Sequence, residues 1–455
     1  MDNRILVVDD EPDFLDSVRR NLIRSGFRKI CLERDPKNAA ALFEQGPSFD
    51  VVLIDVAMPG MDGIALLEII KRISPDTECI MVTAVDKARL AVEALTKGAY
   101  DYLVKPISRE ALVLDVERAL EHKRLLQLIA LRQRPERPEL DHPLAFAAIV
   151  TGSDKMMKVL KEAELHAVSD LPVLITGESG TGKELVARAT HAASSRASFP
   201  FVPVNMGAIS ANLFESEFFG HVKGAFTGAD RDRSGYLEHA DKGTLFLDEI
   251  GSLSPDLQAG LLRVLQEKEY ARVGVGRPRK ADVRFVAASN EDLDALVRRG
   301  DFRKDLYYRL KVAWVHVPPL RERKEDIPLL IRAFLNRNGG ETCPDISEEA
   351  TSLLMDYDYP GNVRELKSIV QSAFNLCRGG HISILCLPDY LPKKSASSKR
   401  KGRDATGPVL QLSEVEKDHI LNVYERMKGN KSRTARALEI GLNTLRRKLE
   451  SYGVS

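Results

Sequence analysis

Five residues in the first 120 positions follow the ends of short apolar runs, where a sheet would bring them together. They are Asp9, Asp10, Asp55, Thr83 and Lys105. The carboxyl ends of parallel strands meet at one edge of a doubly wound sheet, so these side chains are expected to lie close together. Three carboxylates at one edge repel one another unless a hard cation is present, which predicts a Mg²⁺ site. A carboxylate there can attack a phosphoryl donor while the metal and a lysine neutralise the developing charge.

A glycine-rich segment in the middle of the chain predicts a second phosphate site. It consists of Gly177, Glu178, Ser179, Gly180, Thr181, Gly182, Lys183 and Glu184. Glycines let backbone N–H groups wrap phosphates, and a helix N-terminus adds positive potential while Lys183 reaches the outer phosphates. A generic loop of this kind has Ser or Thr where this chain has Glu184. The strand expected near 244–247 ends in Asp248 and Glu249, which suit Mg²⁺ binding and water orientation, so ATP hydrolysis is expected.

The C-terminal part carries most of the positive charge. From Lys393 to the end there are 15 Lys and Arg against 7 Asp and Glu, a net of +8 in a chain whose total is +1. Two short helices, 431–438 and 443 to about 452, joined by a turn that contains Gly441, predict a helix-turn-helix. Arg433 and Arg436 suit DNA phosphates, whereas the second helix presents Asn443, Thr444, Arg446, Arg447 and Lys448.

The elements that hold these sites follow from the apolar pattern. Residues 1–120 alternate buried strands, near 5–8, 51–54, 79–82 and 102–104, with helices, which indicates a doubly wound α/β unit. A second α/β region from about 146 to 320 has strands near 173–176, 201–205, 244–247 and 283–289. Residues 321–388 are expected to be mostly helical.

Two connecting segments are expected between these regions. A helical pattern runs from Ser108 to about Gln133, and it forms either an ordinary terminal helix or a dimerising seam. The seam would use Leu120, Leu125, Leu128 and Leu131. Residues 134–145 are a Pro-broken linker, and residues 393–408 are a basic, flexible tether.

The composition fits about three globular domains, because 455 residues exceed one ordinary core and 44% are hydrophobic against 29% charged. Five cysteines without metal-ligand spacing are expected to be buried, reduced thiols. No apolar run approaches the roughly 20 residues that span a bilayer, and the acidic start does not resemble a signal peptide. A cytoplasmic protein without membrane partners is therefore expected.

The N-terminal residues resemble the receiver domain of bacterial two-component response regulators. The segment Asp55-Val-Ala-Met-Pro-Gly-Met-Asp-Gly63 is close to that family's acceptor loop. The resemblance implies a sensor histidine kinase as partner. It also implies that Asp55 is the phosphoacceptor, that Asp9 and Asp10 hold Mg²⁺, that Thr83 and Lys105 contact the phosphate, and that Tyr102 is the aromatic switch residue.

The central region resembles the AAA+ domain of the nitrogen-regulatory-protein-C (NtrC) family, whose members act on sigma-54 RNA polymerase holoenzyme. That family's phosphate loop reads GExGTGKE, which accounts for Glu184. Glu215-Ser-Glu-Phe-Phe-Gly-His221 precedes the loop by which the family engages sigma-54, which here is Gly224, Ala225, Phe226, Thr227, Gly228 and Ala229. Two glycines make such a loop mobile, and an exposed Phe at its tip favours a partner.

Further roles are implied residue by residue. Asn205 matches the residue that restrains the catalytic Glu249, and Asn290 matches the sensor of the γ-phosphate. The arginine fingers donated to a neighbouring subunit match Arg303 and Arg309, and Arg364 matches the lid arginine that contacts nucleotide. An arginine supplied in trans makes hydrolysis depend on ring assembly.

The C-terminal helices resemble the Fis-type DNA-binding domain of the same family. The resemblance implies a multidomain α/β protein with a receiver (1–120), a helical linker (121–145), an AAA+ domain (146–388, lid 321–388), a basic linker (389–410) and a helix-turn-helix (411–455). The implied function is phosphorylation-controlled, ATP-driven opening of sigma-54 promoters from enhancer-like double-stranded DNA. The implied assemblies are a dimer when inactive and a hexamer or heptamer when active.

Two alternative functions are also considered for this sequence. A DNA-binding repressor would keep the fold without contacting sigma-54, and an AAA+ motor would act on a different protein. The intact Gly224-Ala-Phe-Thr-Gly-Ala229 sequence argues against the repressor, and the helix-turn-helix argues against the motor. The sequence does not decide whether the receiver represses or activates the ATPase.

Overall fold

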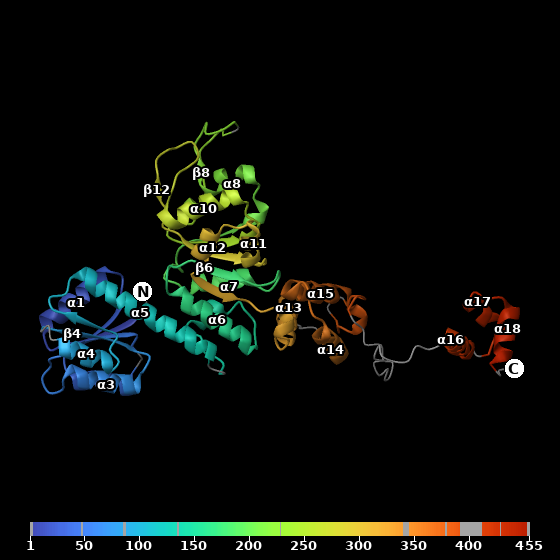
Figure 1. The fold of residues 1–455 in the computed structure, drawn as a ribbon, viewed down its shortest axis with the longest axis horizontal. Helices are drawn as coiled ribbons and strands as arrows, with labels where there is room; N and C mark the ends of the chain where they lie inside the picture. Colours follow the sequence, from blue (N-terminus) through green and yellow to red (C-terminus); the bar gives the residue numbers. More distant parts are fainter. Residues whose placement is uncertain are drawn as a thin grey trace. The chain divides into compact units, whose positions relative to one another are not determined.

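The computed structural model describes residues 3–46, 49–84, 88–133, 136–227, 229–339, 345–377, 380–391, 412–427 and 429–452. The chain forms two compact units, Met1–Pro392 and Lys393–Ser455. The first contains two parallel five-stranded sheets and a set of further helices, and the second contains three helices (Figure 1). The expected fold class is confirmed. The expected tether at 393–408 lies outside the described residues.

The first sheet belongs to the receiver region and has the strand order β2-β1-β3-β4-β5. Its strands are Arg4–Val8 (β1), Lys29–Glu33 (β2), Val51–Asp55 (β3), Glu78–Thr83 (β4) and Asp101–Val104 (β5). Its helices are Pro12–Arg24 (α1), Pro36–Gln45 (α2), Gly63–Ile73 (α3), Ala88–Thr96 (α4) and Arg109–Gln133 (α5). Helices α1 and α5 pack on one face and α2, α3 and α4 on the other, so β3 and β4 are buried throughout. The order reverses between β1 and β3, which opens a crevice at their carboxyl ends.

Helix α5 continues beyond the receiver as one uninterrupted element. Its start is capped by Ser108, whose Oγ accepts a hydrogen bond from the Ala111 amide at 3.1 Å. Leu120 packs on the receiver core, whereas Leu125 is 47% exposed. The second half of α5 contacts α6 (Asp154–Ala167) of the next region. The long helix is therefore as predicted, and its dimerising seam stays a prediction.

The second sheet belongs to the ATPase region and has the order β14-β6-β13-β10-β7. Its strands are Val173–Thr176 (β6), Phe201–Asn205 (β7), Thr244–Asp248 (β10), Arg284–Ser289 (β13) and Ala313–His316 (β14). Helices α6 and α7 (Lys183–Ala192) cover one face. The other face carries Ala211–Phe218 (α8), Tyr236–His239 (α9), Pro255–Glu267 (α10), Leu293–Arg299 (α11) and Lys304–Leu310 (α12).

Two short hairpins extend from the α8–α10 side of this region. Gly220–His221 (β8) pairs with Arg233–Ser234 (β9), and Glu269–Tyr270 (β11) pairs with Arg279–Lys280 (β12). Figure 1 shows β8 and β12 at the same end of the region, beyond α8 and α10. A bridge between His221 and Val273 joins the two hairpins.

The lid is a bundle of three helices, Asp326–Gly339 (α13), Glu348–Asp356 (α14) and Asn362–Leu376 (α15). Cys377 follows α15 and forms a disulfide with Cys386 in the 3-10 helix Ile384–Cys386 (η5). The expectation of reduced thiols is thus wrong for this pair, because lid packing brings these two residues together. Cys31 and Cys79 are free, and burial raises the pKa of the Cys79 thiol to about 12. Cys343 lies outside the described residues.

The C-terminal unit contains Leu412–Arg426 (α16), Lys431–Ala437 (α17) and Leu442–Ser451 (α18). Its small core consists of Ile420, Ala435, Leu445 and Leu449. Asn430 begins α17 by accepting a hydrogen bond from the Arg433 amide at 3.1 Å, as an N-cap does. The helix pair and its intervening turn at Gly441 match the predicted positions. Among the described residues of the whole chain, no helix is long and apolar enough to cross a membrane.

Candidate functional site

The acidic residues of the receiver meet at the carboxyl edge of its sheet. Lys105 Nζ lies 2.7 Å from Asp9 Oδ2 and 3.0 Å from Asp55 Oδ1. Asp55 Oδ2 accepts a hydrogen bond from the Ala57 amide at 2.9 Å. Burial raises the pKa of Asp9, although Lys105 opposes the shift. Burial alone would lower the pKa of Lys105, but its bonds to Asp9 and Asp55 raise that pKa overall.

The other predicted receiver residues surround this group. Asp10 follows β1 and is half-buried, Thr83 ends β4 and is buried, and Tyr102 is half-buried in β5 opposite Met81. Across the described part of the chain, no three acidic, His or Cys side chains are grouped as a ready cation site. The carboxylates of Asp9 and Asp55 nevertheless lie together around the Lys105 ammonium. Carboxylate oxygens gathered in this way are the ligands that a divalent cation prefers.

The phosphate loop follows β6 and leads into α7, as predicted. Gly177, Gly180 and Gly182 have φ values of +150°, +77° and +102°, which residues with a Cβ rarely adopt. Lys183 Nζ donates to the carbonyls of Gly177 at 2.8 Å and Glu178 at 3.0 Å. Burial lowers the pKa of Lys183, and the charge of Asp248 opposes this shift. The lysine is therefore held at the loop that would wrap the phosphates.

The lid contacts the phosphate loop directly. Glu178 forms a two-pronged ion pair with Arg321, at 2.6 and 2.8 Å, and Asn362 Nδ2 donates to Glu178 Oε2 at 3.1 Å. Arg364 Nη1 donates to Ser179 Oγ at 2.9 Å. A Cβ at Gly180 would lie 2.3 Å from the Gly361 carbonyl oxygen, so only glycine permits this approach. The phosphate loop and the lid are thus joined by several side-chain contacts.

The acids after β10 lie beside the phosphate loop. Asp248 is half-buried, and burial raises its pKa. Glu249 adopts φ +55°, an uncommon conformation for a non-glycine residue that is enriched at active sites. Asn205 Oδ1 accepts from the amides of Gly207 and Ala208. A Cβ at Gly207 would lie 2.9 Å from Glu249 Oε2, so the carboxylate lies over the turn that Asn205 caps.

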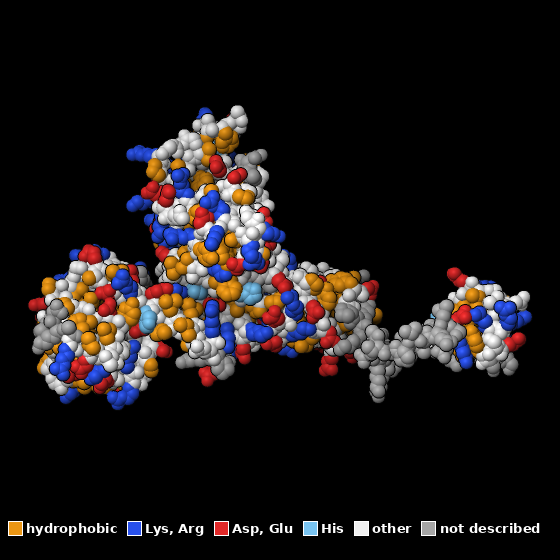
Figure 2. Space-filling model, viewed as in Figure 1, with side chains coloured by type: hydrophobic (Ala, Val, Ile, Leu, Met, Phe, Trp, Pro, Cys, Tyr) orange, Lys and Arg blue, Asp and Glu red, His pale blue; other side chains and the backbone are white. Residues whose placement is uncertain are grey.

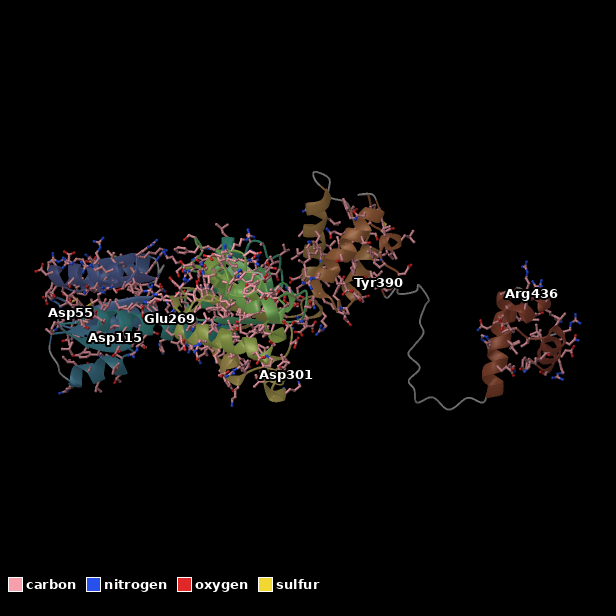
Figure 3. All side chains as sticks on the ribbon, turned by 90° about the horizontal axis from the view of Figure 1, so that it is seen from above. Asp55, Asp115, Glu269, Asp301, Tyr390 and Arg436 are labelled. Atoms are coloured by element: carbon pink, nitrogen blue, oxygen red, sulfur yellow. A yellow bond between two sulfur atoms is a disulfide. The ribbon has the colours of Figure 1, made fainter. Side chains whose placement is uncertain are left out.

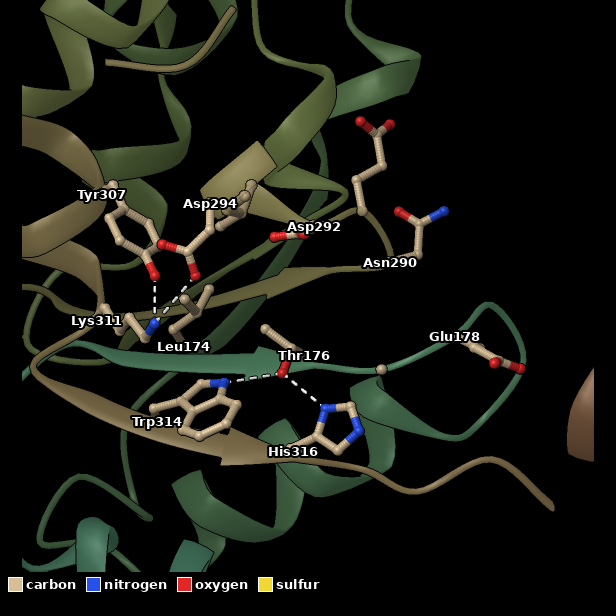
Figure 4. A pocket seen from close by; sticks show the side chains of 13 residues that line it. Leu174, Thr176, Glu178, Asn290, Asp292, Asp294, Tyr307, Lys311, Trp314 and His316 are labelled. Carbon is tan, nitrogen blue, oxygen red and sulfur yellow. Dashed lines mark hydrogen bonds and ion pairs between the residues drawn. The ribbon is translucent and has the colours of Figure 1, made fainter. Parts of the chain in front are cut away.

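A cleft of about 290 Å³ lies beside the phosphate loop and includes Asn290 (Figure 4). On its floor Thr176 Oγ1 accepts a hydrogen bond from Trp314 Nε1 at 2.9 Å and lies 3.0 Å from His316 Nδ1. Lys311 bonds to Tyr307 on the opposite wall. Asn290 follows β13 and is exposed.

Both candidate arginine fingers are exposed on or before α12. Arg303 caps this helix and forms a two-pronged ion pair with Asp305 at 2.8 and 3.1 Å. Arg309 Nη2 donates to the Leu265 carbonyl at 3.4 Å. Both guanidiniums are thereby held at the surface of the domain.

The predicted sigma-54 loop lies between β8 and β9. Phe226 is 40% exposed, and Ala229 is buried. The Gly224 amide donates to the Ala229 carbonyl at 2.9 Å, which closes the loop at its base. Gly228 lies outside the described residues.

The C-terminal unit presents most of its predicted DNA-contacting residues to solvent. The exposed ones are Arg433, Arg436, Asn443, Thr444, Arg446 and Arg447. Figure 2 shows several Lys and Arg side chains on the visible face of this unit, and Arg436 projects outward in Figure 3. Lys448 instead forms an ion pair with Glu416 at 2.6 Å.

Sequence reasoning did not identify the lid residues that hold the phosphate loop. Arg321 and Asn362 lie 143 and 184 positions from Glu178 along the chain. No local sequence pattern predicts contacts over such separations. Arg323, which is buried and donates to the Thr181 carbonyl at 2.8 Å, was missed for the same reason. The one available signal was the segment Pro360-Gly-Asn-Val-Arg, in which Asn362 lies two residues before Arg364.

Four family models match consecutive parts of the chain. They are the response regulator receiver domain (5–117), the sigma-54 interaction domain (149–316), the AAA+ ATPase lid domain (321–404) and the bacterial regulatory protein, Fis family (411–452). These matches favour a sigma-54-dependent activator over the two alternatives, a DNA-binding repressor and an AAA+ motor that acts on a different protein.

Similar proteins match over almost their whole length. Regulatory protein AtoC from Escherichia coli K12 is 42% identical over 99% of this chain and 98% of its own. DNA-binding transcriptional regulator NtrC from the same organism is 39% identical over 99% of both chains. The crystal structure of NtrX from Brucella abortus in complex with ADP is 33% identical, covers 100% of both chains and has a TM-score of 0.51.

The domains of this chain therefore follow the same order as those of its relatives. The receiver with its acidic edge comes first, the phosphate loop and its lid come next, and the helix-turn-helix comes last. AAA+ and sigma-54 interaction domains are ATPases, so the chain binds and hydrolyses ATP. The chain belongs to the NtrC family of sigma-54-dependent two-component response regulators, which are phosphorylation-controlled, ATP-hydrolysing transcription activators.

Proposed function

We propose that a sensor histidine kinase supplies the phosphoryl group that Asp55 accepts. The carboxylate attacks the phosphorus through one oxygen while the P–N bond to the kinase's phosphohistidine breaks and its imidazole leaves. Lys105, already 3.0 Å from Asp55 Oδ1, neutralises the added charge. Thr83 contacts the phosphate, and Tyr102 in β5 follows it as the switch residue. The single observation that carries this step is the shared contact of Lys105 with Asp9 and Asp55.

Mg²⁺ is proposed at both phosphate sites. In the receiver Asp9, Asp10 and Asp55 would hold it, and the convergence of Asp9 and Asp55 on Lys105 supports this assignment. In the ATPase Asp248 would hold it opposite the lysine of the phosphate loop. The cation supplies charge neutralisation at the transferring phosphoryl group.

Hydrolysis is proposed to use a distinct role for each residue of the ATPase site. Lys183 binds the outer phosphates, and Glu249 orients the attacking water. Asn205 restrains Glu249 through the turn that it caps, which fits the position of the carboxylate over Gly207. Asn290 senses the γ-phosphate, and Arg364 closes the lid over the nucleotide. The remaining contacts come from the loop residues Gly177, Glu178, Ser179, Gly180, Thr181, Gly182 and Glu184.

The hydrolysing form is proposed to be a ring in which Arg303 and Arg309 complete a neighbour's site. The exposure of both side chains supports this assignment. A dimer held through the exposed apolar side chains of α5 is proposed for the inactive state, and a hexamer or heptamer for the active one. The exposed residues of α5 include Leu125, Leu126 and Ile129.

The output is proposed to be the opening of sigma-54 promoters. Residues 224–229, with Phe226 at 40% exposure, contact sigma-54, and the basic face of α17 and α18 binds enhancer-like DNA in the cytoplasm. The domain limits proposed for these steps are 1–120, 121–145, 146–388, 389–410 and 411–455.

The test is open-complex formation on a supercoiled sigma-54 promoter with purified sigma-54 holoenzyme. High protein concentration replaces the unknown operator, and permanganate reactivity of melted thymines is the readout. Wild-type protein with phosphorylated Asp55 and ATP is expected to melt the promoter, whereas Asn205→Ala and Thr227→Ala are expected to fail. ATP-dependent melting that persists in Thr227→Ala would overturn the assignment of the loop.

A further inference from the structure

The side chain of His221 lies beneath Phe226 at the base of the 224–229 loop. The two ring centroids are 5.0 Å apart and the ring planes make an angle of 63°, an edge-to-face arrangement. His221 is 7% exposed, whereas Phe226 is 40% exposed. Ring pairs of this geometry are favourable beyond the apolar area that they bury. The contact therefore stabilises the position in which Phe226 is folded back on the domain.

His221 is fixed more firmly than the loop above it. It lies in β8, pairs with Arg233 of β9, and forms the bridge to Val273. Its Nδ1 lies 2.7 Å from the Oγ of Ser216, a buried residue of α8. The imidazole is thus tied to β8 and α8, whereas Phe226 belongs to the loop above them.

The folded-back loop also has backbone and hairpin contacts. The Ala229 amide donates to the Phe226 carbonyl at 3.1 Å, and the Ala225 amide donates to Val222 at 3.1 Å. Gly274, at φ +86°, lies so near that a Cβ would be 2.7 Å from the Cβ of Ala225. These contacts hold the backbone of the loop, whereas the ring pair holds the side chain of Phe226.

Helix α8 connects this base to the hydrolytic acids. It follows the 3-10 helix Met206–Ala208 (η2), which is the turn that Asn205 caps. Glu249 Oε2 lies over Gly207 in that turn. Ser216 on α8 therefore lies in the chain segment between the residues near Glu249 and the loop.

We infer that His221 is a positioning residue that holds Phe226 retracted, and that Ser216 fixes the imidazole to helix α8. This inference rests on the proposed function, in which Phe226 contacts sigma-54. The strength of the ring contact sets how much of the loop is released before the hydrolysis transition state is reached. A weaker contact releases the loop without nucleotide and uncouples sigma-54 binding from hydrolysis.

Three variants separate the ring from the hydrogen bond. His221→Asn removes the ring and keeps a polar partner for Ser216, His221→Phe keeps a ring beneath Phe226, and Ser216→Ala removes the hydrogen bond with little change of volume. A matched control is His191→Asn. His191 is also 7% exposed, its Nδ1 lies 2.9 Å from Thr244 Oγ1, and its ring lies 5.4 Å from that of Phe201, between α7 and β10.

The readout is hydrogen–deuterium exchange of the 222–229 peptide in nucleotide-free, full-length protein. We expect exchange about two- to tenfold faster in His221→Asn, the range that the loss of one ring pair gives, and near wild-type exchange in His221→Phe. Ser216→Ala should give a smaller increase. His191→Asn should leave this peptide unchanged. Equal exchange in His221→Asn and wild type, or the same increase in His191→Asn, would overturn the inference.

Sigma-54 capture provides the functional readout. His221→Asn is expected to retain sigma-54 without the mimic of the hydrolysis transition state, at several times the wild-type level, with ATP hydrolysis retained. If His221→Asn captures sigma-54 only when the mimic is present, as the wild type is expected to do, the inference is contradicted. If wild-type protein captures no sigma-54 under any condition, the proposed function fails, while the exchange experiment still judges the role of His221.

Discussion

Glu178 of the phosphate loop and Arg321 at the beginning of the lid form a two-pronged ion pair, with N–O distances of 2.6 and 2.8 Å. The pKa of Glu178 is lowered to about 2, mainly by its hydrogen bond with Arg321 and then by its hydrogen bond with Asn362. Arg321 belongs to the short 3-10 helix Leu320–Glu322 (η4) that leads into the lid. The pair therefore joins the two walls between which nucleotide binds.

Breaking this pair should weaken nucleotide binding more than folding. Arg321→Ala removes an exposed ion pair, so its effect on the free energy of unfolding should be small. It also releases Glu178 and the lid, so the dissociation constant for ADP should rise by about fivefold, the equivalent of ~1 kcal/mol. Isothermal titration measures this change. Lys324→Ala, which breaks the exposed Lys324–Asp358 pair (3.6 Å) of the same region, is the control and should leave the ADP affinity unchanged.

Lys183→Ala should abolish ATP hydrolysis and leave DNA binding intact. The ammonium, buried and bonded to the carbonyls of Gly177 and Glu178, supplies charge stabilisation that no neighbouring residue replaces. We expect kcat to fall at least ~100-fold, as for the loss of one preorganised donor. A coupled assay for phosphate release and a salt-dependent DNA shift measure the two properties. Full ATPase activity in this variant would mean that nucleotide binds elsewhere.

The arginine fingers predict complementation between two inactive proteins. Arg303→Ala has an intact phosphate loop but lacks a finger, and Lys183→Ala has the opposite defect. Each alone should lose hydrolysis, about a thousandfold for the finger. Mixing them should restore part of the activity, because mixed rings contain some complete sites. No recovery at any mixing ratio would indicate that Arg303 acts within its own subunit or not at all.

The contact between α5 and α6 predicts a pH dependence. His166 is buried, and its Nδ1 lies 2.7 Å from Arg124 Nη1. The pKa of His166 is lowered to about 3, mainly by burial and then by the positive charges of Arg124, Arg284 and Arg132. The unfolded value is near 6.5, so below about pH 6.5 protons bind the unfolded chain preferentially. This contribution to stability is complete above that pH and is lost progressively as the pH falls toward 3.

The corresponding measurement is thermal unfolding of wild type and His166→Gln at pH 7.5 and pH 5.5. Glutamine keeps a polar group near Arg124 and does not titrate. The wild type should lose more thermal stability on acidification than the variant does. Equal losses in the two proteins would show that His166 does not titrate with unfolding.

Much of the fold could be predicted from sequence because buried parallel strands are continuous apolar runs. Strands β3 and β10 were predicted in this way. Within the two five-stranded sheets, the missed strands were β2 (Lys29–Glu33) and β14 (Ala313–His316), which lie at the sheet edges. β2 is only partly buried, and β14 alternates buried and exposed residues, so neither has the signal of a buried strand.

Some residues of the candidate site could also be predicted from the sequence, and others could not. Lys183 and Asp55 were predictable because each lies in a short local motif. The contacts of Glu178 with Arg321 and of Ser216 with His221 were not predicted, because hydrogen-bond partners depend on how elements pack. The disulfide between Cys377 and Cys386 was missed for the same reason, since spacing alone does not define which cysteines approach each other.

ATP hydrolysis is proposed to act on sigma-54 through the 224–229 loop. A native-gel shift of the purified protein with sigma-54 tests this coupling in the presence of ADP and aluminium fluoride, which mimics the hydrolysis transition state. We expect a trapped complex with wild-type protein that disappears in Thr227→Ala, while both proteins hydrolyse ATP. A protein that hydrolyses ATP yet never traps sigma-54, with Asp55 phosphorylated or with the receiver removed, would contradict it.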